Sequence, residues 1–250
     1  MPTSPVRSDG GSAARQAGRQ DGRQARWDRH NQERRQRILD AALSVVEEGE
    51  PGAEVHVQQI AERAGLSRTV VYRHFSDRAD LDRAVQTAIV DDLSGELLPA
   101  VTLDGTIPQI IERIVSTYVS WAVAHPALHR LAEQDSSTSG PGPLQHGIER
   151  IALAVAELIT TAFDLLEVEL GEDERASVDP LVFGLVGAVF SAVRRWMARP
   201  ERTPSAPVLV SLVTDSVWYL LQGHARTLGV PLERDEPVEV LLARSRSTAG

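Results

Sequence analysis

The chain has 250 residues and a formal net charge of −9, with 42% apolar and 24% charged residues. This composition is that of an ordinary globular protein and excludes a wholly disordered, collagen-like or low-complexity chain. There is no cysteine, which excludes disulfides, thiolate metal sites and cysteine nucleophiles. The longest uncharged apolar stretch, residues 180–193, is too short to span a bilayer, and the N-terminus has no apolar signal core, so we expect a cytoplasmic protein.

Charge is unevenly distributed along the chain. Residues 1–37 hold nine arginines against four acidic residues, whereas residues 86–250 hold twelve arginines against twenty-two acidic residues. Residues 1–30 also have almost no large apolar side chains, so burial cannot offset the entropy lost on ordering them. We therefore expect residues 1–30 to form a disordered, Arg-rich arm, which either contacts DNA or has no role.

Apolar spacing along the rest of the chain is helical and predicts an all-α protein. A helix begins at Arg34 and ends near Gly49, and Thr106 caps a later one that ends near Ala124. The other predicted helices cover residues 57–64, 68–74, 78–97, 126–134, 144–169, 178–198 and 206–226. We divide the chain into the arm (1–30), a first domain (31–85), a larger helical domain (86–228) and a C-terminal tail (229–250).

The segment 57–75 has the pattern of a helix-turn-helix. Ala61 lies four residues before Gly65, and Val71 lies six residues after it. Two short helices that cross steeply need a small residue at the contact, a glycine with positive φ in the turn, and an apolar residue on the second helix. Two ordinary core helices with a coincidental glycine are the alternative on these three positions alone.

The second of these helices, 68–74, separates apolar from polar residues. Val70, Val71 and Phe75 supply its inward side, and a polar outward side of this kind fits the DNA major groove. Arg68 lies near its N-terminal end and is the candidate for bidentate pairing with guanine O6 and N7. The candidate DNA-contacting residues are Arg34, His56, Gln58, Ser67, Arg68, Thr69, Tyr72, Arg73, His74 and Arg78.

The runs 37–43, 59–67, 71–75 and 78–81 together resemble the N-terminal domain of TetR-family transcriptional regulators. The resemblance implies a three-helix DNA-binding domain with a helix-turn-helix, joined by a fourth helix to a helical ligand-binding and dimerising domain. It also implies repression relieved by a small molecule. Two features depart from the family pattern: His56 replaces the usual Ser or Thr cap, and residues 38–85 hold five arginines against nine acidic residues.

The larger domain has few aromatic side chains, which at helical spacing are either core or ligand-binding residues. Because the family encloses its effector between helices, we expect Tyr118, Trp121 and Phe183 to line such a cavity. The helix 106–124 carries only two charges, which favours an apolar or amphipathic effector. The helices 178–198 and 206–226 are apolar on more than one side, which fits either a central position in the monomer or, as the resemblance implies, a two-fold dimer interface.

The sequence offers little support for catalysis or for a metal site. His125 and His129 have a ligand-like spacing, but Pro126 interrupts the helix between them. Nucleophile-elbow, Walker and dinucleotide motifs are absent. We expect no enzyme, no metal and no cofactor, but a homodimeric, ligand-responsive repressor of a near-palindromic operator. The alternative is an all-α effector-binding or scaffolding protein with little specific DNA affinity.

Overall fold

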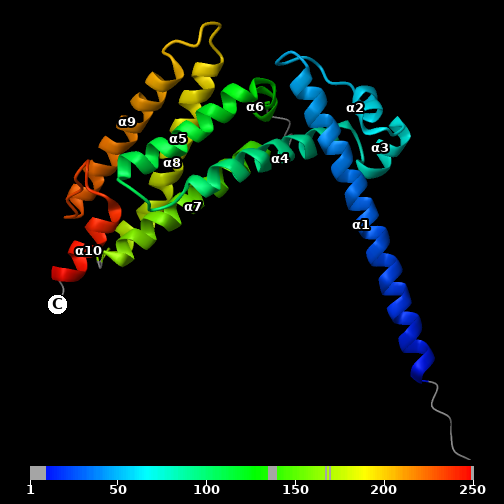
Figure 1. Ribbon diagram of the computed structural model, residues 1–250, viewed down its shortest axis with the longest axis horizontal. Helices are drawn as coiled ribbons and strands as arrows, with labels where there is room; N and C mark the ends of the chain where they lie inside the picture. The colour runs from blue at the N-terminus through cyan, green and yellow to red at the C-terminus, as the bar shows by residue number, and fades with distance from the viewer. Residues whose placement is uncertain (1–9, 135–139, 167, 169, 249–250) are drawn as a thin grey trace, which may run out of the picture. The chain divides into compact units, whose positions relative to one another are not determined.

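The computed structural model describes residues 10–134, 140–166, 168 and 170–248, with side chains described from Trp27 to Ala243 within these ranges. The described residues form ten α-helices and one 3-10 turn without any strand, which confirms the all-α class (Figure 1). Chain contacts separate two compact units. We call Met1–Val45 with Glu54–Leu81 the head, and Val46–Ala53 with Asp82–Gly250 the body.

The first helix is longer than the sequence predicted. α1 covers Gly10–Glu48, so residues 10–30 of the predicted disordered arm lie in a helix, and the helix does not begin at Arg34. Twelve of residues 10–30 are Arg, Gln or Ala, which have high intrinsic helix propensity and favour a helix in spite of four glycines and the scarcity of large apolar residues. Residues 1–9 of the arm lie outside the described residues.

The head is built from α1, α2 (Val57–Ala64), α3 (Arg68–His74) and the first turn of α4 (Arg78–Leu97). Gly65 has φ +67° and ends α2, as the helix-turn-helix pattern predicts. Ala61 and Val71 are buried on the facing sides of α2 and α3, together with Phe75. Asp77 accepts a hydrogen bond from the Asp80 amide at 2.7 Å and caps α4.

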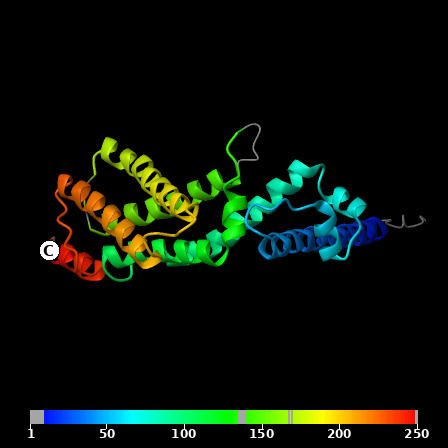
Figure 2. The ribbon, with the colours of Figure 1, turned by 90° about the horizontal axis from the view of Figure 1, so that it is seen from above.

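The body contains the rest of α4 and all later helices (Figures 1 and 2). α7 packs along α8 and α5 packs along α9, which gives two helix pairs. Most of the buried apolar residues of the body belong to these four helices. The bounds are η1 Leu98–Ala100, α5 Ile107–Ala124, α6 Pro126–Ala132, α7 Pro143–Leu165, α8 Glu172–Met197, α9 Ala206–Thr227 and α10 Val238–Thr248.

Three body segments differ from the prediction by more than two residues. α7 ends at Leu165, four residues before the predicted end. α8 begins at Glu172, six residues early, and contains Pro180. Three acidic residues in its first turn favour a helix N-terminus there, and the Glu174 carboxylate accepts the Gly171 amide at 2.9 Å. The predicted tail 229–250 includes α10, whose Val238 and Leu241 are buried in the body, so this segment is part of the body unit.

Candidate functional site

The helix α3 leaves its polar side open to solvent. Arg68, Thr69 and Arg73 are exposed, and Tyr72 is half-buried. The Arg68 guanidinium carbon lies 5.6 Å from the centre of the Tyr72 ring, a distance suitable for a cation–π contact. The polar side of α3 therefore presents two guanidinium groups and two hydroxyls, which are donors suited to base edges and phosphate oxygens.

Arg35 positions the end of α3, a role that the sequence analysis missed. Its Nη1 donates a 2.7 Å hydrogen bond to the His74 carbonyl, and its guanidinium carbon lies 4.2 Å from the centre of the Phe75 ring. Burial, followed by the charges of Arg34 and Arg35, lowers the pKa of His74. His74 is therefore neutral near pH 7 and offers a phosphate a hydrogen bond without a charge.

The two N-cap positions of the helix-turn-helix make no side-chain capping bond. His56 is the N-cap of α2, but its amide donates to Gln59 Oε1 at 2.8 Å, and its own ring lies 3.6 Å from a Glu54 carboxylate oxygen. Ser67 is the N-cap of α3, and its hydroxyl has no hydrogen-bond partner among the described residues. Ser67 is therefore available to a phosphate, whereas Glu54 competes for His56.

None of the ten candidate DNA-contacting residues is buried. Gln58 donates to Glu62 Oε1 at 2.7 Å and would have to exchange this bond for one to DNA. Arg78 is half-buried and already has a partner within the chain. The fully exposed members are Arg34, His56, Gln58, Ser67, Arg68, Thr69 and Arg73, while Tyr72, His74 and Arg78 are partly covered. Their contacts with DNA stay a prediction.

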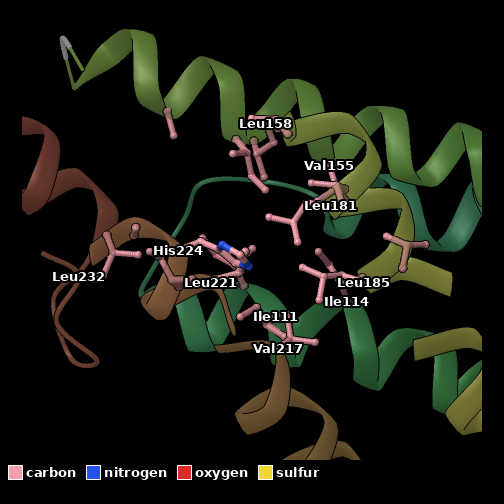
Figure 3. A pocket seen from close by; sticks show the side chains of 18 of the residues that line it. Ile111, Ile114, Val155, Leu158, Leu181, Leu185, Val217, Leu221, His224 and Leu232 are labelled. Atoms are coloured by element: carbon pink, nitrogen blue, oxygen red, sulfur yellow. The ribbon is translucent and has the colours of Figure 1, made fainter. Parts of the chain in front are cut away.

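The body encloses an apolar cavity of about 380 Å³. Figure 3 shows side chains of α7 and α8, such as Leu158 and Leu181, pointing toward Ile111 of α5 and Leu221 of α9. The cavity therefore lies between the two helix pairs. Five polar residues are among its lining, namely Tyr118, Glu174, Ser177, His224 and Thr227, and all the others are aliphatic or aromatic.

The three predicted effector residues have different positions. Tyr118 lines the cavity, with its ring centre 4.4 Å from that of Phe190. Trp121 does not line it, because its Nε1 donates to Asp92 of α4 at 3.0 Å. Phe183 does not line it either, and instead packs on a buried cluster that includes Ala152 and Val182. Helical periodicity placed all three on inward faces but did not distinguish a void from a filled contact.

The cavity wall is connected to α6 and then to α4. The Tyr118 hydroxyl lies 3.0 Å from His129 Nε2 of α6, and both side chains are buried. Burial, with the charges of Arg194 and Arg202, lowers the pKa of His129 to about 4, so the imidazole is neutral near pH 7. Gln86 of α4 donates to the carbonyls of Leu131 and Gln134 at the end of α6, at 3.1 and 2.6 Å.

The two histidines with ligand-like spacing do not converge on one point. His125 pairs with Glu47, whereas His129 bonds Tyr118 and lies 3.6 Å from Glu133. Within the part of the chain that the structure describes, no group of three His, Asp or Glu side chains could hold a metal ion.

The helices α8 and α9 carry an unusual amount of exposed apolar surface. Leu212 and Tyr219 of α9 are 59% and 62% exposed, and Val208 and Leu220 are also exposed. The exposed residues of α8 include Gly184 and Ala188, which are small. By length and composition α8 could cross a membrane, a property that core helices of soluble proteins share. We call these exposed residues the α8–α9 face.

Comparisons with known proteins agree with the helix-turn-helix. The family model of bacterial regulatory proteins of the tetR family matches residues 38–85. The chain is 29% identical over 208 residues to the HTH-type transcriptional regulator Rv0472c of Mycobacterium tuberculosis, covering 81% of this chain and 83% of that protein. It is 28% identical over 167 residues to the HTH-type transcriptional activator FasR of Mycolicibacterium smegmatis, covering 66% and 73%.

A solved structure shows that the similarity of fold extends over most of the chain. A TetR-family transcriptional regulator from Streptomyces coelicolor superposes with a TM-score of 0.60 at 20% identity, covering 86% of this chain and 89% of that one. The predicted class, a regulator and not an enzyme, is therefore confirmed. Residues 38–85 therefore match the DNA-binding helix-turn-helix domain of the TetR family, and the chain as a whole is similar to HTH-type transcriptional regulators and to TetR-family folds.

Proposed function

We propose that this regulator is a ligand-responsive repressor that works in the cytoplasm and binds a near-palindromic operator as a homodimer. The proposal of DNA recognition rests on the difference between the two sides of α3. Arg68, Thr69 and Arg73 are exposed on one side, while Val71 on the other side is fully buried. A helix divided in this way is suited to the major groove, because its buried side anchors it while its polar side reads base edges.

The α8–α9 face supports the homodimer. Large exposed apolar side chains such as Leu212 and Tyr219 are unfavourable in water, and the small residues Gly184 and Ala188 let a second helix approach closely. In a two-fold contact between two copies, the α8–α9 face of each protomer would be buried against the same face of the other. Such a contact would also supply two copies of α3, which suits a near-palindromic operator.

The cavity supports a small apolar or amphipathic effector. Its volume of about 380 Å³ lies within the range of small-molecule sites, and its wall is almost wholly apolar. Tyr118, His129 and the end of α6 connect this wall to Gln86 of α4. An occupant that shifts Tyr118 would therefore disturb the hydrogen bonds that hold α6 against α4.

A DNA-binding titration tests the proposal. Fluorescence anisotropy compares a duplex from upstream of the chain's own gene with a shuffled duplex at about 50 to 200 mM salt. We expect the upstream duplex to bind at least about 10³-fold more tightly, with two protomers per duplex. No sequence-specific excess at any salt would favour the alternative, an effector-binding or scaffolding protein, which the acidic balance of residues 38–85 also suits.

The direction of regulation has its own measurement. FasR is named an activator, so a relative of this chain can act in the opposite sense. We expect that removing the regulator raises expression of a reporter under the operator, and that adding effector to the intact system does the same. A fall in expression on removal would identify an activator.

A further inference from the structure

The shape of the cavity limits what it can hold. Its lining runs along α5 from Ile107 to Tyr118 and along α8 from Glu174 to Phe190, which at 1.5 Å per residue is about 16 to 24 Å. The wall is apolar along nearly all of this length. The cavity can therefore hold an extended aliphatic chain.

The two ends of the cavity differ in polarity. Glu174, Ser177, His224 and Thr227 lie at one end of the lining, where the first turn of α8 meets the last turns of α9, and all four are exposed. Tyr118 and Phe190 lie at the opposite end and are buried. A molecule in the cavity would therefore have its apolar end enclosed and its polar end beside solvent.

Among the polar side chains of the lining, His224 is the one whose two polar atoms both lack a hydrogen-bond partner within the described residues. Tyr118 bonds His129, and the Glu174 carboxylate accepts the Gly171 amide. The remaining hydroxyls donate to backbone carbonyls of their own helices. The His224 imidazole has no partner among the described residues, and Figure 3 shows it pointing into the cavity among Leu221, Leu232 and other apolar side chains.

We infer that the cavity binds a single-chain amphiphile, with a linear aliphatic tail along α5 and α8 and one terminal oxygen head group, a hydroxyl or a carboxylate, held by His224. This inference rests on the proposed effector response and names the chemical class of its ligand. The imidazole can donate to either head group, and neutral imidazole can also accept from a hydroxyl. The tail contributes most of the affinity, because burial of methylenes is the dominant favourable term in such a site.

A chain-length series with the intact protein tests the tail. Calorimetry and thermal shift measure linear 1-alkanols, alkanoates and n-alkanes of increasing length. We expect affinity to rise about fourfold per added methylene until the tail reaches Tyr118. Ile114→Trp, which narrows the cavity, should abolish the gain for long tails while DNA binding is retained. Tighter binding of a fused-ring compound than of any linear chain would overturn the inference.

Three histidine variants test the head group. His224→Ala should weaken alkanol and alkanoate binding about three- to tenfold and leave the increment per methylene unchanged. His224→Gln should restore most of the affinity, and His146→Ala, an exposed histidine of α7 outside the cavity, should change nothing. Alkanol affinity that is equal in wild type and His224→Ala, or equal to that of the n-alkane, would overturn the role of His224.

The same samples separate the inference from the function on which it rests. A protein that binds its operator but no linear amphiphile refutes the inference alone. A protein that binds the amphiphile but no specific DNA refutes the proposed repressor alone.

Discussion

Arg68 and Arg78 differ in the contacts that they can make with DNA. Arg68 is exposed at the N-terminal end of α3, whereas Arg78 begins α4 and is half-buried. We predict that Arg68→Ala relaxes base preference at one position of each half-site and costs about 1–3 kcal/mol, because a bidentate contact with guanine is lost. Arg78→Ala should weaken specific and random DNA alike. Anisotropy on single-base operator variants measures both, and an equal loss on all sequences for Arg68→Ala would contradict its assignment as base reader.

His129 makes stability depend on pH. Its pKa of about 4 in the folded body lies below the value of about 6.5 for an unfolded chain, so the unfolded state binds more protons between these values. We predict that the free energy of unfolding falls as pH falls from about 6.5 to about 4, by up to about 3 kcal/mol from this residue. Above pH 6.5 its contribution is constant.

Denaturant unfolding of wild type and His129→Asn across this pH range isolates the effect. Burial raises the pKa of the neighbouring Glu133, which acts in the opposite sense but is present in both proteins. The variant should be less stable near pH 7 and should lose less stability on acidification. Parallel pH profiles for the two proteins would show that His129 does not titrate as proposed.

α4 and α7 pack closely at Gly147. A Cβ atom added there would lie 2.2 Å from Val90 Cγ1, and valine is stiff at χ1 in a helix. We predict that Gly147→Ala destabilises the body by about 1–3 kcal/mol, because the helices must move apart. Gly95→Ala on α4 is the matched control. It meets nothing within 4 Å and should stabilise by about 0.5–1 kcal/mol, so thermal unfolding shifts in opposite directions for the two variants.

The α8–α9 face is expected to hold two protomers together. We predict that Leu212→Glu shifts the protein toward monomer in size-exclusion chromatography with light scattering, because a two-fold contact buries the added carboxylate on both sides. Leu153→Glu is the control, since Leu153 is similarly exposed but belongs to α7. Equal effects of the two substitutions would exclude this face as the dimer interface.

The N-terminal segment carries positive charge outside the helix-turn-helix, and its deletion tests how far DNA affinity depends on that charge. Deleting residues 1–30 removes six arginines and three aspartates. We predict weaker DNA binding and a shallower dependence of log affinity on log salt, because fewer counterions are released, while dimerisation and effector binding are unchanged. Equal salt slopes for full-length and truncated proteins would show that DNA attraction comes from the rest of the head, residues 31–45 and 54–81.

The local features of the helix-turn-helix were predictable from the sequence. α2, α3 and α4 have the predicted bounds, and Gly65 has the predicted positive φ. These features depend on a few neighbouring residues, through helical periodicity and the conformational freedom of glycine. The all-α class and the similarity of residues 38–85 to the TetR-family DNA-binding domain followed from the same local patterns.

The tertiary structure alone decided which inward side chains border the cavity. Tyr118 and Trp121 are neighbours on the same helix, yet one lines the void and the other bonds Asp92. The position of His224 in the wall and the role of Arg35 at the end of α3 depend on helices that are distant in the chain. Periodicity shows that a helix face is apolar, but a void forms only where several such faces fail to fill the space between them, which is a property of their joint packing.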